Sequence, residues 1–172
     1  MKKAIVGLAL LAALYSSATL ADVVTSGQSP QQRALLSAYF TNATTTFSNT
    51  PVTFNVTAGR RYSFIAALYV SDSTAADGAK IDFNGGTATI SNFRSHCVLN
   101  DTTTLLVGSA QSTALSTALT AALLTGAGVW VCTGTVELSV SGTFIVRAAQ
   151  NSHTTGTLTV ARGSWAAIED VP

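Results

Sequence analysis

The stretch RYSFIAALYV, from Arg61 to Val70, decides the fold of this chain. In an extended segment, successive side chains point to opposite sides. Phe64 therefore falls on one side with other apolar residues, whereas Ile65 and Tyr69 fall on the other side. A segment that is apolar on both sides is typical of a central strand buried between two layers. We expect this stretch to be such a strand in an all-β protein.

Further strand patterns lie on both sides of this central stretch. Asn84-Gly85-Gly86 is a strong signal for a hairpin turn. About eight strands separated by such turns predict an antiparallel, jelly-roll-like β-sandwich over residues 51–172. The other alternating segments, bounded by Gly, Asn and Asp, are residues 52–56, 80–83, 87–99, 129–140, 143–150 and 156–171.

Residues 105–124 fit two structures. Leu115, Leu119 and Leu123 are spaced by four, which suits one face of a helix. Thr and Ser occupy nearly every other position, which suits two short strands around Ser112. We favour the strands.

The composition limits the classes of function. The chain has 172 residues, which suits one domain, and 47% of them are hydrophobic, so it can bury enough surface to fold. Only 10% are charged and the net charge is +1, whereas 26 Thr and 18 Ser supply small hydroxyls. A charged surface for nucleic acid is therefore excluded, and we expect no nucleic-acid partner.

The amino terminus has the three parts of a secretory signal peptide. Basic residues at 2–3 precede an apolar run at 4–15, and small residues follow up to Ala21. We expect residues 1–21 to be either a signal peptide cleaved near Ala21 or a retained hydrophobic arm. Residues 22–50 are polar and predict a linker or attachment arm.

The two cysteines, Cys97 and Cys132, are separated by 35 positions and form no CxxC pair. In an exported chain an even pair of cysteines favours a disulfide. The alternative is two small buried thiols on neighbouring strands.

No metal or cofactor site is expected. His96 points away from the neighbouring Cys97 in an extended segment, and His153 lies in a polar turn. Asp72 and Asp77 share a loop and could hold Ca²⁺ together with backbone carbonyls. The simpler interpretation is a pair of solvated turn residues.

No catalytic residue stands out, and we expect no enzyme. The stretch Gly126-Ala127-Gly128 lacks the third glycine of a dinucleotide-binding fingerprint. The stretch Gly163-Ser164-Trp165 lacks the flanking pattern of a nucleophile elbow. A Ser-His-Asp triad has no motif to indicate it.

Aromatic and basic residues offer weaker hypotheses. Trp130, Trp165 and Tyr69 could form a platform for sugars, although packing in the core is the more ordinary role of such residues. Three arginines lie in strand-like stretches, where cross-strand or inter-subunit pairing is expected: Arg94, Arg147 and Arg162.

Four stretches carry a resemblance to a known family: PVTFNVTAG (51–59), RYSFIAALYV (61–70), AADGAKIDFNGGTATISNF (75–93) and SGTFIVRAAQNSHTTGTLTVARGSWAAIEDVP (141–172). They resemble a domain of virion-associated and tail-fibre-like structural proteins of tailed bacteriophages and prophages. The resemblance covers residues 47–172. It implies a compact β-sandwich, similar in design to trimeric jelly-roll heads, on a particle surface. It rests on strand and turn residues, so it assigns no functional residue.

The expected function is a non-enzymatic protein on a bacteriophage virion, as a capsid decoration, head fibre or tail-associated domain. Its expected partners are further copies of itself, with a homotrimer favoured, and other virion proteins. Host surface glycans are a further expected partner. The alternative is a secreted bacterial adhesin or carbohydrate-binding module with a Cys97–Cys132 bridge.

Overall fold

A computed structural model describes residues 31–101, 108–121, 124, 126–152 and 155–171. These residues form two antiparallel sheets that pack face to face, and the predicted all-β sandwich is confirmed. The described chain contains no helix with the length and hydrophobicity that membrane crossing requires. The elements are β1 Gln31–Leu35, β2 Phe40–Asn42, β3 Ser48–Val56, β4 Arg61–Asp72, η1 Ala75–Asp77, β5 Ala79–Asn84, β6 Thr89–Asp101, β7 Gly108–Ser112, β8 Leu119–Ala121, β9 Ala127–Val140, β10 Gly142–Gln150, β11 Leu158–Val160 and β12 Trp165–Val171.

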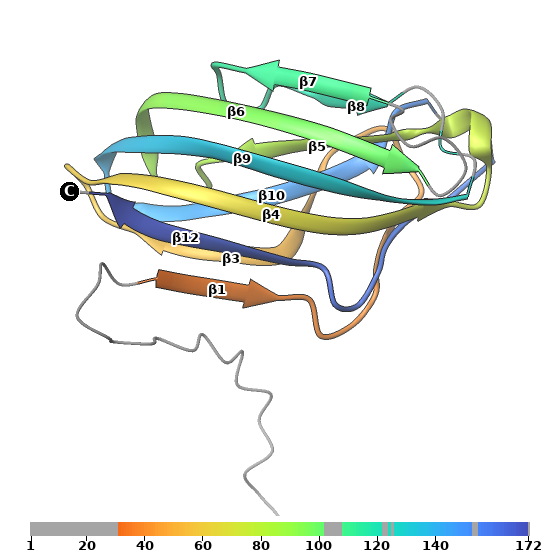
Figure 1. Ribbon diagram of the computed structural model, residues 1–172, viewed down its shortest axis with the longest axis horizontal. Coiled ribbons are helices and arrows are strands. Elements are labelled where there is room, and N and C mark those ends of the chain that lie inside the picture. Colours follow the sequence, from red (N-terminus) through yellow and green to blue (C-terminus); the bar gives the residue numbers. More distant parts are fainter. Residues whose placement is uncertain (1–30, 102–107, 122–123, 125, 153–154, 172) are drawn as a thin grey trace, which may run out of the picture.

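The larger sheet has eight strands, and its main path runs β1-β12-β4-β9-β6-β7. The short strands β11 and β2 extend it beside β4. The smaller sheet runs β3-β10-β5-β8. Figure 1 looks onto the larger sheet, with β12, β4, β9 and β6 in front of β3, β10 and β5. β4 lies at the centre of the larger sheet, as expected. The expected burial between two layers is not observed, because Ile65 and Tyr69 on its outer face are exposed.

The core lies between the two sheets and is centred on four phenylalanines. Phe64 and Phe93 come from the larger sheet, and Phe83 and Phe144 come from the smaller one. Their ring centroids are 4.8 to 6.3 Å apart, which is the range of favourable aromatic contacts. The side chains at the even positions of β4 point into this core. The alternating apolar residues of this strand therefore pack the larger sheet against the smaller one.

The predicted hairpin at Asn84-Gly85-Gly86 is wrong, although the turn itself exists. The turn is closed by the Ala88 N–H, which donates to the Gly85 carbonyl at 2.6 Å, and Gly86 has a φ of +52°. However, β5 belongs to the smaller sheet and β6 to the larger one. The turn is therefore an arch between layers, because the following strand finds its partner in the other sheet.

Residues 31–50 do not form the predicted linker. They supply β1, β2 and the first three residues of β3, so the sandwich begins before residue 51. Their polar composition is explained by position: β1 and β3 are edge strands with many exposed side chains. The remaining part of the predicted linker, residues 22–30, and the leader at 1–21 lie outside the described residues.

The strand count also differs from the expected eight, because several predicted segments are divided. A turn at residues 161–164, with Gly163 at φ +91°, splits the last predicted strand into β11 and β12. This turn contains Arg162, so Arg162 is not a strand residue as predicted. In the ambiguous region 105–124, the described residues form β7 and β8, which agrees with the strands that we favoured.

Candidate interaction surface

The outer face of the larger sheet carries a row of apolar side chains that crosses five strands. Each member is the register partner of the next, so the side chains are direct cross-strand neighbours. We call this the apolar row, and it consists of Leu35 on β1, Trp165 on β12, Ala67 on β4, Val131 on β9 and Val98 on β6.

The apolar row is broadened along β4, and all of its members except the buried Ala67 are partly or largely open to solvent. Ile65 and Tyr69 lie two residues to either side of Ala67, on the same face. The exposed fractions are 68% for Leu35, 47% for Tyr69 and 39% for Ile65. A contiguous exposed apolar surface of this kind is typical of a contact site for another molecule.

Two local contacts hold the aromatic residues of this face in place. The guanidinium carbon of Arg33 lies 5.3 Å from the centre of the Trp165 ring, a cation–π contact from the neighbouring strand. The Tyr69 N–H donates to Ser164 Oγ at 3.0 Å, and that hydroxyl donates to the Ala161 carbonyl at 2.8 Å. The turn between β11 and β12 is therefore tied to β4, which positions Trp165 beside Ala67.

The three aromatic residues proposed as a sugar platform do not come together. Tyr69 and Trp165 lie on the outer face, whereas Trp130 is fully buried in the core. Its indole N–H has no hydrogen-bond partner among the described residues. For Trp130 the ordinary core interpretation is therefore the one that the structure supports.

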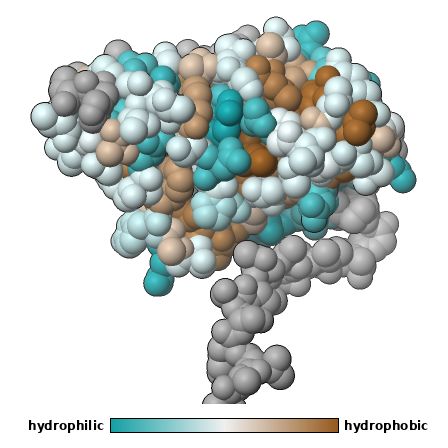
Figure 2. All heavy atoms as spheres, turned by 180° about the vertical axis from the view of Figure 1, so that it is seen from behind, coloured by the Kyte–Doolittle hydropathy of each residue, from teal (hydrophilic) through white to brown (hydrophobic). Residues whose placement is uncertain are grey.

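The opposite side of the molecule, shown in Figure 2, carries a polar cluster on the smaller sheet. Asp82 and Arg147 are cross-strand partners, and Arg147 Nε donates to Asp82 Oδ1 at 2.8 Å. Burial raises the pKa of Asp82 above its usual 3.8, and the hydrogen bond and charge of Arg147 oppose that rise. The Phe47 ring lies beneath both Arg147 and Lys80. Cross-strand pairing of Arg147, one of the expected roles, is thus observed.

Asp72 and Asp77 are brought together, but as a buried hydrogen-bonded cluster. Gln150 Nε2 donates to both carboxylates, at 3.1 and 3.2 Å. The Thr74 N–H donates to Asp72 Oδ1, and the Gly156 N–H donates to Asp77 Oδ2. Side-chain and backbone N–H groups therefore occupy hydrogen-bonding positions on both carboxylates. The cluster therefore ties η1 to β4 and β10, and the two residues are buried rather than solvated.

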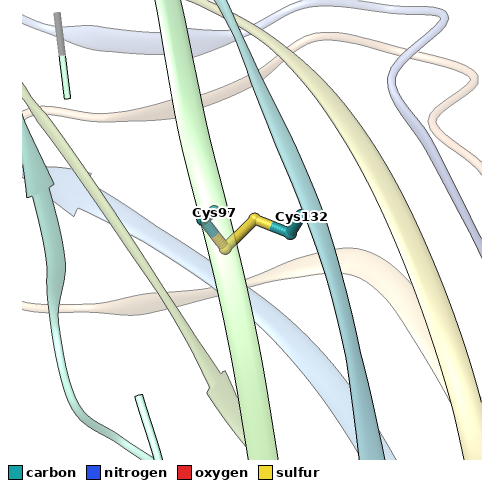
Figure 3. Close-up of a disulfide and its surroundings, with 2 residues drawn as sticks. All are labelled: Cys97 and Cys132. Atoms are coloured by element: carbon teal, nitrogen blue, oxygen red, sulfur yellow. A yellow bond between two sulfur atoms is a disulfide. The ribbon is translucent and has the colours of Figure 1, made fainter. Parts of the chain in front are cut away.

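Cys97 and Cys132 form a disulfide in the structure, with the sulfurs 2.13 Å apart. The two residues are register partners on β6 and β9, and both are completely buried (Figure 3). His96 is exposed on the outer face, as the alternation of the strand predicted. His153 lies outside the described residues.

An open pocket of about 440 Å³ lies at the end of the sandwich where β4 begins. Its charged lining consists of Arg60, Arg61 and Glu137. Arg61 Nε donates to Glu137 Oε1 at 2.7 Å, and Arg60 lies 3.1 Å from a carboxylate oxygen of Asp170. Each arginine is thus neutralised by a carboxylate, which leaves little net charge to attract an anion.

Two residues that matter for the outer face and its edge were missed by the sequence interpretation. Leu35 and Gln32 both lie in the segment that the sequence predicts to be a linker. Gln32 connects the edges of the two sheets: its side-chain Nε2 donates to the Asn55 carbonyl at 2.7 Å, and its Oε1 accepts from the Asn55 N–H at 3.2 Å. The available signal was the alternation QQRAL at 31–35, which is compatible with a short edge strand.

No family model matches the chain, and no curated protein matches it. Among solved structures, an arabinose-bound GH51 α-L-arabinofuranosidase is 13% identical with a TM-score of 0.26, over 84% of this chain and 18% of that chain. A CocE/NonD family hydrolase from Staphylococcus aureus is 10% identical with a TM-score of 0.25, over 80% of this chain and 34% of that chain.

The infectious bursal disease virus VP2 subviral particle is 10% identical to the chain with a TM-score of 0.22. That match covers 83% of this chain and 41% of that chain. This chain therefore spans less than half of each of these proteins. All three similarities are too low to carry a conclusion about function.

Proposed function

We propose that this chain is a non-enzymatic structural protein on the surface of a bacteriophage virion. The observation that supports this proposal is the outer face of the larger sheet, which presents the apolar row to solvent. Repeated contacts between subunits require surfaces that lose water at low cost, and an apolar face with few charges meets that requirement. The resemblance of residues 47–172 to virion-associated domains supports a phage virion as the particle that carries this protein.

Mass spectrometry of the protein from its native source tests this proposal. Purified phage particles and the cell-free secreted fraction are compared for peptides of the chain. Peptides in the particles at a fixed ratio to the other virion proteins are the expected result. Peptides confined to the secreted fraction contradict the proposal.

A second candidate, a secreted binding module, is favoured by the disulfide between Cys97 and Cys132. Disulfides persist in exported proteins and are rare in a reducing cytosol. Here the chain begins at Asp22 after cleavage, and Tyr69 and Trp165 offer rings to a glycan. The expected results are a secreted protein without free thiols and glycan-array binding that Tyr69→Ala abolishes. Free thiols, or an array without binding, contradict this candidate.

A further inference from the structure

Both faces of the larger sheet carry apolar side chains, but the described residues cover only its inner face. The inner face of β4 packs on the smaller sheet through residues such as Phe64 and Leu68. Its outer face presents Ile65 and Tyr69 without a covering layer from the described residues. A strand with this composition is typical of burial on both faces. The second layer therefore comes from outside the described sandwich.

We propose that a second copy of this chain supplies that layer, packed face to face about a two-fold axis, in a dimer rather than the homotrimer expected from the sequence. The axis runs parallel to the strands, along the line between β4 and β9. The strand order β1-β12-β4-β9-β6-β7 has three strands on either side of this line. The axis therefore places β4 of one copy over β9 of the other, and β12 over β6. This inference deepens the proposed function, on which it rests for the premise that the face is a subunit contact.

The volumes of the side chains complement one another under this axis. Ala67, the smallest member of the apolar row, faces Val131 of the second copy. Trp165, the largest member, faces Val98, the residue next to Val131 in the row. Tyr69 faces Val129, its register partner within the chain. Large side chains thus oppose smaller ones along the contact, which is what two packed sheets need in order to interdigitate.

The charges complement one another as well. Glu169 on β12 and Arg94 on β6 lie in the same cross-strand line of the outer face, joined through Ser63 and Thr135. Within one copy they are three strands apart, roughly 14 Å at the usual strand spacing. Neither makes an ion pair among the described residues. The two-fold axis brings Glu169 of each copy over Arg94 of the other, so the dimer contains this pair twice.

The size of the face suits such a contact. Six strands of about seven residues give roughly 700 Å² per copy at the usual strand spacing and rise. Specific protein contacts bury about 800 Å² per partner, so the face comes close to that standard size. The expected product is a dimer that dissociates in the micromolar range.

Charge reversal tests the proposal with purified protein in the form found in its native source. The variants are Glu169→Arg and Arg94→Glu, compared with Thr53→Arg, a control on the exposed face of the smaller sheet. Light scattering and sedimentation equilibrium at low salt give the mass and the dissociation constant. We expect a dimer for the parent and the control, and at least tenfold weaker association for each reversal. Circular dichroism and the thermal midpoint establish that every variant is folded.

Mixing the two reversed variants gives the decisive result. In a mixed dimer both contacts again join opposite charges, so an equimolar mixture is expected to associate as tightly as the parent. The double variant, with both reversals in one chain, is expected to regain self-association for the same reason. A parent that is monomeric at tens of micromolar, a trimer, or a dimer that neither reversal weakens overturns the proposal. Particle mass spectrometry is independent of this outcome, so the two proposals can fail separately.

Discussion

At the scale of single residues, the buried carboxylate of Asp82 depends on Arg147 for a compensating positive charge. Removing one partner of a buried pair leaves an uncompensated charge, which is strongly destabilising. We expect Arg147→Met to lower the free energy of unfolding by about 3 kcal/mol near pH 7. Chemical denaturation measures this loss. Lys80→Met is the matched control, because Lys80 contacts the same Phe47 ring and makes no hydrogen bond to Asp82 among the described residues.

The pH dependence of the same variant follows from the pKa of Asp82. Because burial raises that pKa above 3.8, the folded state binds a proton more tightly than the unfolded state does. Stability contributed by this group is therefore present at low pH and is lost as the pH rises through the raised pKa. Without Arg147 the rise is larger, so the variant is expected to recover part of its lost stability as the pH falls toward 4. An equal loss at pH 4 and pH 7 would contradict this explanation.

At the scale of elements, Gln32 protects the edge of the smaller sheet. Its side-chain amide bonds both backbone groups of Asn55, which lies on the edge strand β3. Gln32→Leu is expected to cost about 1 kcal/mol and to expose an edge on which another chain can pair. Thermal unfolding with simultaneous light scattering measures both effects. Gln31→Leu, on the other side of β1, is the control, and aggregation that is the same in both variants would argue against the edge as its cause.

The disulfide acts at the same scale, because it joins β6 to β9. Closing a segment of 35 positions restricts the unfolded chain and stabilises the fold by about 4 kcal/mol. We expect the double variant Cys97→Ala/Cys132→Ala to unfold at a correspondingly lower denaturant concentration. The parent protein under a strong reductant is the comparison. A midpoint that neither treatment moves would show that β6 and β9 do not need the bond.

The positions of the strands could be predicted from the sequence more reliably than the pairing between strands. Alternation located β4 and β9 because a side-chain period of two survives in any sheet. The Asn84–Gly86 turn was also visible, but no local signal states whether the next strand joins the same sheet or crosses to the other. Residues 31–50 were misread because edge strands carry polar residues, as linkers do. Which elements pack on each face of β4 depends on residues distant in sequence. The sequence therefore could not predict that Ile65 and Tyr69, on the outer face, are exposed.

At the scale of the whole molecule, the proposed dimer requires the outer face to contribute to association rather than to folding. Val131 is 36% exposed and lies beside the proposed two-fold axis. We expect Val131→Asp to leave the thermal midpoint within a few degrees of the parent, since its side chain is outside the core. Association should be abolished, because the charge would be buried in the contact. Thr120→Asp, exposed on β8, is the control for added charge, and an associated Val131→Asp protein would exclude this face from the contact.

The pairing of β1 with β12 has a mechanical consequence. Gln31 lies opposite Glu169, so the start of β1 and the end of β12 lie at the same end of the sandwich, as Figure 1 shows. A pulling force applied between Gln31 and Val171 acts across one antiparallel pair and peels it apart one residue pair after another. A force between Val171 and the turn at Ser73, at the far end of β4, instead loads the strands along their length, where their hydrogen bonds share it. The molecule is thus compliant when it is pulled between Gln31 and Val171 and stiff when it is pulled along its long axis.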